Sequence, residues 1–116
     1  VVDRKKDMLI SGGLNVYPAE IERVLAGMPG IIEVAVIGVP HEKWGEAPAV
    51  VVFTGGAEVK AEDVLARCKA QLADFKLPRY FYVSPTPLPR NMSGKILKRE
   101  LKIELAHLPQ TSKAIR

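Results

Sequence analysis

Lys95 stands at the end of a short glycine-containing turn, in the stretch "LPRNMSGKILKREL" (residues 88–101). A lysine ammonium is a compact positive charge on a long stem, and it can stabilise negative charge that develops on a phosphate or carboxylate during a reaction. Gly94 allows the backbone to approach a ligand closely, and the prolines before it restrict the loop. The alternative is that Lys95 is one more cation on a basic surface.

The residues around Lys95 exclude a Walker A phosphate loop. That loop requires the pattern GxxxxGK[ST]. In this chain Pro89 takes the place of the first glycine and Ile96 the place of the final hydroxyl residue, so the pattern is PxxxxGK. The function of the lysine must therefore be inferred from a longer stretch of sequence.

The composition indicates one folded domain whose C-terminal half meets an anionic partner. The chain has 116 residues, of which 47% are hydrophobic, and a net charge of +4. Residues 1–59 carry 5 Lys+Arg against 8 Asp+Glu (−3), whereas residues 60–116 carry 12 against 5 (+7). No apolar run reaches the roughly 20 residues that span a bilayer. The start, "VVDRKKDMLI", resembles no signal peptide and has no initiator Met, so we expect a piece of a longer chain.

Hydrophobic periodicity and turn residues predict an alternation of strands and helices. The expected elements are two short strands around Gly12-Gly13, a helix from Pro18, strands at 31–39 and 49–53 with a polar loop between them, a helix at about 61–73, a strand at 79–83, a helix at about 96–106 and a frayed tail at 107–116. The predicted fold class is therefore α+β, with a small three-stranded sheet flanked by helices and a short two-stranded β element near the N-terminus.

Two long stretches together carry a family resemblance. "DRKKDMLISGGLNVYPAEIE" near the start and "LPRNMSGKILKREL" near the end resemble the two signature stretches of the C-terminal domain of adenylate-forming enzymes. The stretch "VAVIGVPHEKWGEAPAVVV" between them is similar to the acyl-CoA synthetase branch, of the fatty-acid or aryl-acid type. The resemblance covers residues 1–105 in the right order and spacing, so residues 1–116 are interpreted as that mobile domain.

The resemblance implies an activity that needs a second domain. The parent enzyme would use ATP and Mg²⁺ to convert a carboxylic acid into an acyl-adenylate, and would then transfer the acyl group to CoA. The C-terminal domain would swing about a hinge and present a different face in each half-reaction. The N-terminal domain, which holds ATP, Mg²⁺ and the acid, is its expected partner, so this domain alone is expected to be inactive. A cytoplasmic location is expected.

The resemblance also implies roles for residues near the ATP side of the reaction. Lys95 matches the catalytic lysine of adenylation, which would bridge the carboxylate and the α-phosphate. Arg4 lies where relatives anchor the ribose end of ATP. Lys6 matches the hinge position, with Lys5 as the alternative register.

The resemblance also implies which residues contact CoA. Gly12 and Gly13 match glycines that line the pantetheine tunnel, although a tight turn also requires glycine there. The other implied CoA contacts are two aromatic residues near the nucleotide and two cations near the phosphates: Trp44, Phe75, Lys76 and Arg79. Simple packing is the alternative for both aromatic residues. Leu77 stands where several relatives carry Arg, which weakens the assignment of phosphate contacts, and Met92 replaces a frequent Thr.

The remaining polar residues are given structural roles. Glu20 and Glu22 are interpreted as helix-start or interdomain charges, and Cys68 as a core residue on an apolar helix face. One cysteine excludes an internal disulfide, and His41 and His107 have no evident catalytic partner, so no metal site is expected.

The sequence leaves two kinds of alternative: an adenylate-forming enzyme that does not use CoA, and a binding domain without enzymatic activity. An adenylation domain of a peptide synthetase or another enzyme that does not use CoA is disfavoured by "GG" and "HEKWGE", and luciferase by Ile10, where luciferase carries a lysine. The other alternative is a small basic RNA-binding domain that uses the +7 half, with Tyr80 and Tyr82 as stacking residues. No ribonucleoprotein-type motif supports it, and no nucleic-acid partner is expected.

Overall fold

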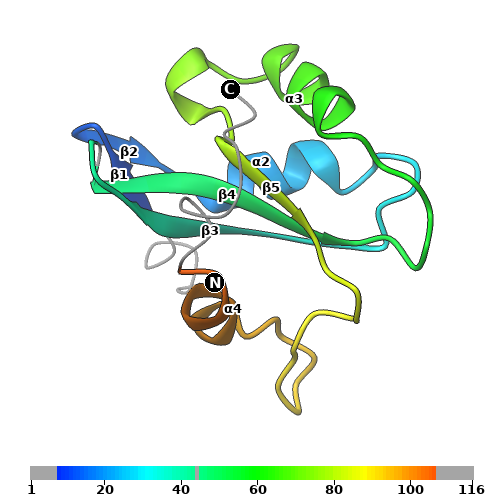
Figure 1. Ribbon diagram of the computed structural model, residues 1–116. Coiled ribbons are helices and arrows are strands. Elements are labelled where there is room, and N and C mark those ends of the chain that lie inside the picture. Colours follow the sequence, from blue (N-terminus) through cyan, green and yellow to red (C-terminus); the bar gives the residue numbers. More distant parts are fainter. Residues whose placement is uncertain (1–7, 44, 107–116) are drawn as a thin grey trace.

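A computed structural model of the chain describes residues 8–43 and 45–106 (Figure 1). The described part is a mixed sheet covered by helices on both faces. The elements in chain order are β1 (Leu9–Ser11), β2 (Leu14–Val16), α2 (Pro18–Leu25), β3 (Glu33–His41), β4 (Gly45–Phe53), α3 (Ala61–Lys69), the 3₁₀ helix η1 (Asp74–Lys76), β5 (Tyr80–Val83) and α4 (Lys98–Glu104). The predicted α+β class is confirmed.

The strands β1 and β2 form the predicted two-stranded element. They pair antiparallel around Gly12 and Gly13, whose φ angles are 61° and 83°. Two successive residues with positive φ make the tight hairpin turn that matches the right-handed twist of the strands. The element is also joined to the main sheet, because Ser11 pairs with Gly45 of β4.

The strands β3 and β4 form one long hairpin, and here the sequence prediction of a polar loop over 40–48 was wrong. The two strands pair continuously from Glu33 with Phe53 to His41 with Gly45. Two prolines and several charged residues indicated a loop, but Val39 and Ala47 are completely buried. Burial of these alternating side chains extends the pairing as far as the pair His41 with Gly45.

The strand β5 completes the sheet by pairing in parallel with β4, from Ala49 with Tyr80 to Val52 with Val83. The strand order is β2-β1-β4-β3, and β5 is a further partner of β4. The three expected strands are therefore present, and with the N-terminal hairpin they make a five-stranded sheet.

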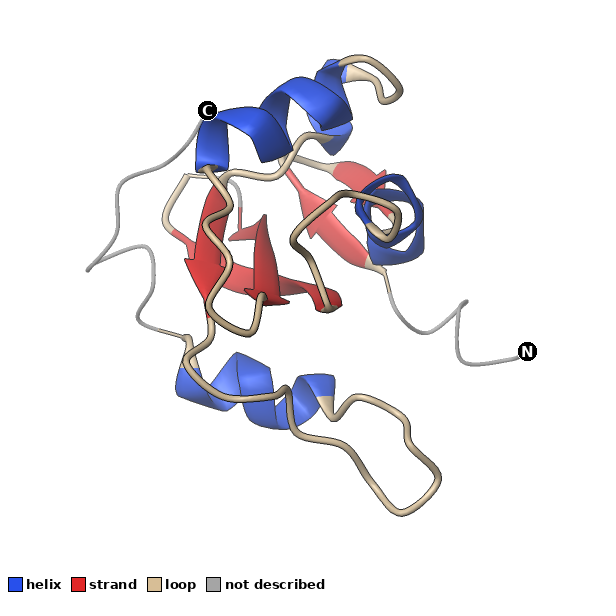
Figure 2. Ribbon diagram, turned by 90° about the vertical axis from the view of Figure 1, so that its right-hand side faces the viewer, coloured by secondary structure: helices blue, strands red, loops and turns tan. Residues whose placement is uncertain are grey.

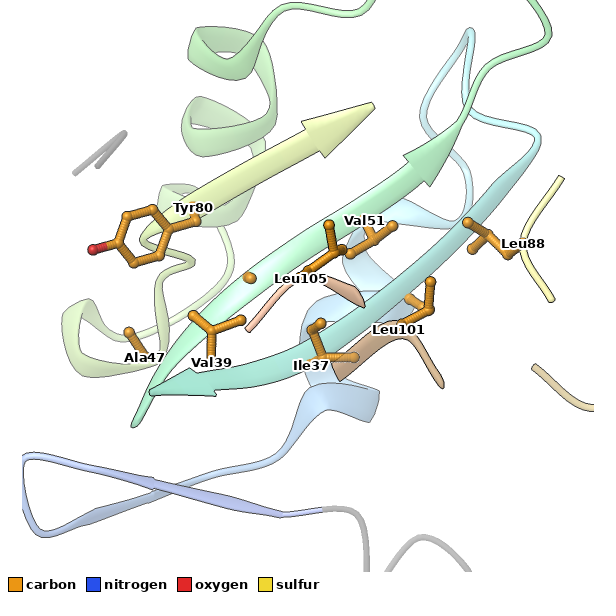
Figure 3. Packing of buried hydrophobic residues seen from close by; sticks show 10 residues of the cluster. Ile37, Val39, Ala47, Val51, Tyr80, Leu88, Leu101 and Leu105 are labelled. Atoms are coloured by element: carbon orange, nitrogen blue, oxygen red, sulfur yellow. The ribbon is translucent and has the colours of Figure 1, made fainter. Parts of the chain in front are cut away.

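The sheet has two buried faces, and the alternation of side chains along β3 and β4 assigns residues to each. Figures 1 and 2 show α2 and α3 on one side of the sheet and α4 on the other. The face under α4 is packed by residues that include Ile37, Val51, Leu101 and Leu105 (Figure 3). The face under α2 and α3 is packed by another set, which includes Val36, Val50, Ile21, Leu25, Val64 and Cys68. The domain is thus a three-layer α/β/α sandwich.

The helices are shorter than the sequence predicted. Pro18 suits the first turn of α2, where its missing N–H is not needed. The helix α3 ends at Lys69 rather than near 73, and α4 begins at Lys98 rather than near 96. The predicted tail at 107–116 lies outside the described residues.

Candidate active-site loop

Lys95 lies on a small, well hydrogen-bonded loop between β5 and α4. An isolated antiparallel bridge joins Arg90 to Ile96, so the two sides of the loop run next to each other. Asn91 organises the tip: its N–H donates to the Lys95 carbonyl oxygen at 2.9 Å, and its Oδ1 accepts from the N–H groups of Ser93 at 2.9 Å and Lys95 at 3.0 Å. Asparagine commonly forms such turns through its side chain. The loop that carries Lys95 is therefore ordered by its own residues.

Gly94 has a structural reason to be glycine. Its φ is +83°, in the left-handed region that other residues adopt only with strain. An added Cβ would meet nothing within 4 Å, so space does not exclude a side chain there. The glycine thus provides the backbone turn immediately before Lys95, whose own side chain is exposed.

The loop forms one wall of an open groove of about 870 Å³ whose other walls are α2 and the start of α4. Five of its lining residues are cations: Arg23, Arg90, Lys95, Lys98 and Arg99. The acidic residue among the lining residues, Glu22, pairs with Lys98 at 2.6 Å and accepts the Val36 N–H at 2.9 Å. The groove next to Lys95 therefore has a positive charge balance, which suits a phosphate-containing ligand.

The Gly12-Gly13 hairpin lies well away from the Lys95 loop (Figure 1). It is exposed, and a Cβ on Gly13 would meet nothing within 4 Å. Within the described residues, the glycine requirement at Gly13 is therefore set by its backbone conformation, and the predicted tunnel role remains a prediction.

We expect Gly13→Ala to destabilise the chain by about 1–2 kcal/mol, because alanine is strained at φ +83°. Urea unfolding of the two proteins would measure this difference. Gly27→Ala is the matched control, since Gly27 is not among the glycines with positive φ. Equal losses for both variants would contradict the explanation.

The predicted CoA contacts on η1 lie near the hairpin, because η1 packs against β2. Phe75 is 38% exposed, and the Lys76 Nζ lies 5.6 Å from the centre of its ring. Lys76 also pairs with Glu20 at 3.0 Å. Arg79 is half-buried, and its backbone N–H donates to the Pro48 carbonyl oxygen at 2.9 Å.

Other predicted residues fall elsewhere. Leu77 is 1% exposed and belongs to the core, which explains why an apolar residue suits that position. Glu20 and Glu22, interpreted as helix-start or interdomain charges, form ion pairs inside the domain with Lys76 and Lys98. The predicted sites at Arg4, Lys6 and Trp44 lie outside the described residues, as does His107, to which no role was assigned.

Cys68 is completely buried on α3, as the apolar helix face predicted. Removal of the thiol from water raises its pKa from 9.0 to about 11, opposed in part by the charge of Arg67. An unfolded chain would release this proton near pH 9, whereas the folded chain keeps it. Protonation thus favours the folded state below pH 9, and this contribution is lost as the pH rises from 9 to about 11.

We therefore expect the free energy of unfolding to fall more steeply from pH 9 to 11 in the wild-type chain than in Cys68→Ala. Urea unfolding at several pH values would measure both slopes. Other groups also titrate in this range, so the difference between the two proteins is the relevant quantity. Parallel slopes would show that the thiol makes no such contribution.

Three residues that support the site, Glu33, Arg90 and Asn91, have no role assigned from the sequence. Glu33 and Arg90 form an ion pair that supports the loop from β3. Glu33 is the one charged residue in the apolar run "IIEVAVIGV". A charge in such a run could have been recognised as a residue that needs a partner elsewhere in the chain. Asn91, within the motif itself, could have been recognised as a turn-forming residue.

The fold and site define a class of protein: a small α+β domain that presents a lysine on an ordered loop beside a cationic groove. Residues 20–95 match the model of the AMP-binding enzyme C-terminal domain, and the chain belongs to this family.

No helix among the described residues is long and apolar enough to cross a membrane.

The relatives that it resembles are CoA ligases. It is 51% identical over 102 residues to the long-chain-fatty-acid–CoA ligase FadD13 of Mycobacterium tuberculosis, a match that covers 88% of this chain and 20% of the ligase. It is 47% identical over 116 residues to the 4-chlorobenzoate–CoA ligase of a Pseudomonas species, covering 98% of this chain and 21% of that protein. The chain thus spans about a fifth of the length of these relatives.

Solved structures agree with the sequence matches. A fatty acyl CoA synthetase of Mycobacterium tuberculosis superposes with a TM-score of 0.83 at 48% identity, covering 89% of this chain and 20% of that one. Apo MatB from Rhodopseudomonas palustris gives 0.84 at 43% identity, covering 90% of this chain and 21% of that one. The family resemblance found in the sequence is confirmed, and nothing in these matches supports the RNA-binding alternative.

Proposed function

We propose that this chain is the C-terminal domain of an ATP-dependent carboxylic acid–CoA ligase. The observation that carries the proposal is the Lys95 loop beside a groove lined by cations, in a domain that is 51% identical to part of a fatty-acid–CoA ligase. The parent protein would activate an acid as its adenylate and transfer the acyl group to CoA. It would do so in the cytoplasm.

In the adenylation step, the Lys95 ammonium would contact the attacking carboxylate and the α-phosphate of ATP. Both groups are negatively charged, and their repulsion is greatest as the new bond forms, so a fixed cation there lowers the barrier. Arg4 would contact the ribose end of ATP, and the cations of the groove other than Arg90 suit its phosphates. Mg²⁺ would be held by the N-terminal domain and would neutralise phosphate charge.

In the thioester step, the domain would turn about Lys6 and present the Gly12-Gly13 hairpin instead. The two glycines would leave room for the pantetheine arm, and the residues near the nucleotide of CoA would be Trp44, Phe75, Lys76 and Arg79. The distance between the hairpin and the Lys95 loop supports this use of two faces (Figure 1). Lys76 would have to exchange Glu20 for a CoA phosphate, and the exposure of Phe75 suits stacking.

The test is a pair of half-reaction assays on the full-length protein that contains this chain. With ATP, Mg²⁺ and a panel of fatty and aromatic acids, at least one acid should give an acyl-adenylate and pyrophosphate. The purified adenylate with CoA should then give the acyl-CoA thioester. Transfer only to a phosphopantetheinyl carrier protein would instead identify the peptide-synthetase alternative, and absence of any adenylate would refute the proposal.

A further inference from the structure

The peptide unit between Gly94 and Lys95 is held on both sides. The Gly94 carbonyl oxygen accepts a hydrogen bond from the Arg90 Nη1, and the Lys95 N–H donates to the Asn91 Oδ1 at 3.0 Å. Because a peptide unit is planar, two such bonds fix its orientation. That orientation sets the direction in which the Lys95 side chain leaves the backbone.

Arg90 connects this peptide unit to the sheet. Its Nε donates to the Glu33 Oε2 at 2.7 Å, and its Nη2 forms an ion pair with the same oxygen. The other carboxylate oxygen of Glu33 accepts the Leu88 N–H at 3.0 Å. Glu33 is the first residue of β3, and its side chain is 11% exposed. A continuous chain of hydrogen bonds therefore runs from β3 through Arg90 to the Gly94 carbonyl of the Gly94–Lys95 peptide unit.

The chemistry of arginine suits this bridging position. Its planar guanidinium presents several donors in a rigid fork, so one side chain can bind a carboxylate and a carbonyl at the same time. Arg90 is 43% exposed, so water screens its charge, and Glu33, at 11%, keeps the Leu88 N–H as a hydrogen-bond donor when Arg90 is absent; the ion pair therefore contributes little to overall stability. Its contacts with the loop therefore have more influence on where Lys95 points than on whether the domain folds.

We propose that Glu33 and Arg90 are positioning residues for Lys95 in the adenylation step, an inference that rests on the proposed function. The pair aligns the Gly94–Lys95 peptide unit with the sheet, and the ammonium is thereby placed before ATP binds. Misplacement of a reacting group by about 1 Å is enough to lower a rate by roughly 100-fold. Loss of Arg90 therefore slows adenylation and leaves the thioester step unchanged.

The experiment uses the full-length protein in four forms: wild type, Arg90→Met, Lys95→Ala and the double variant. We expect Arg90→Met to lower kcat of adenylation about 10- to 100-fold, with KM for ATP within about twofold, because positioning acts on the transition state. Thioester formation from supplied acyl-adenylate and CoA should stay at the wild-type rate. In the Lys95→Ala background, Arg90→Met should have no further effect, because Arg90 acts through Lys95.

Matched variants separate positioning from folding and from general charge. Lys102→Met removes one exposed cation from α4 and should leave both half-reactions unchanged. Glu33→Gln keeps the shape of the side chain and should show the same loss of adenylation with unchanged thioester formation. This variant tests the inference if Arg90→Met does not fold. An additive effect in the double variant would mean that Arg90 contacts the substrate directly, and this would overturn the inference.

The proposed function and the inference fail in different ways. If the wild-type protein forms no acyl-adenylate from any acid of the panel, the proposed function is refuted. If the wild-type protein does so and Lys95→Ala forms acyl-adenylate at the same rate, the role of Lys95 and the positioning inference are refuted. If Lys95→Ala is inactive in adenylation while Arg90→Met and Glu33→Gln are as active as wild type, only the positioning role is refuted. Equal losses in both half-reactions for Arg90→Met and Glu33→Gln would also refute it, because they would indicate a general structural defect.

Discussion

Lys95→Ala in the full-length protein should reduce acyl-adenylate formation by about 100- to 1000-fold, the usual cost of removing one group that stabilises transition-state charge. The alanine variant keeps the loop, because the hydrogen bonds of Asn91 go to the backbone of Lys95. The loss therefore reports the ammonium itself. Rates of acyl-adenylate and pyrophosphate formation at saturating ATP would measure it.

The second half-reaction is the internal control for this variant. Thioester formation from supplied acyl-adenylate and CoA should stay at the wild-type rate, because the Gly12-Gly13 hairpin and not the Lys95 loop would then face the active site. Lys95→Arg tests whether charge alone suffices; we expect only partial recovery, because the guanidinium is planar and larger than an ammonium. Survival of both half-reactions in Lys95→Ala would make Lys95 a surface cation and would remove the mechanistic basis of the proposal.

Leu101→Ala should destabilise the 116-residue chain by about 2–5 kcal/mol, the range found when a buried leucine is truncated and a cavity remains. Leu101 is 3% exposed and packs with Leu105 against the face of the sheet that includes Ile37 (Figure 3). Few other side chains hold α4 on the sheet, because the helix is short. Urea unfolding followed by circular dichroism would measure the change.

Ile103→Ala is the matched control on the same helix. Ile103 is 74% exposed, so its truncation removes little buried surface, and alanine favours the helix. We expect a change within about 0.5 kcal/mol. Similar losses for the two variants would mean that α4 does not pack as described.

Most of the fold could be predicted because its signals are local. The apolar runs of β3 and β4, the spacing of Ile21 and Leu25, and the glycine pair of the hairpin all act within a few residues. The extent of the β3–β4 pairing could not be predicted in the same way. It depends on partners across the sheet and on burial under α4, which outweigh the local preference of Pro40 and Pro48 for a loop.

The candidate site also contains some residues that a local motif reveals and others that only the folded chain brings together. Lys95 and Gly94 belong to one contiguous motif, and the motif was sufficient to single them out. The ion pair between Glu33 and Arg90 joins residues 57 positions apart, so no pattern within a short window reveals it. Likewise, the proximity of η1 to β2 appears only when the chain is folded.

The parallel pairing of β5 with β4 has a consequence for biosynthesis. The hairpin of β3 and β4 closes over a very short turn and can form as soon as residue 53 has left the ribosome. The edge of β4 over residues 49–52 must then wait for residues 80–83, which lie beyond the whole of α3. During that interval a run of valines presents unpaired backbone groups to the solvent, as exposed strand edges do. Nascent chains stalled between residues 53 and 80 should therefore be the species that most readily aggregate or recruit chaperones.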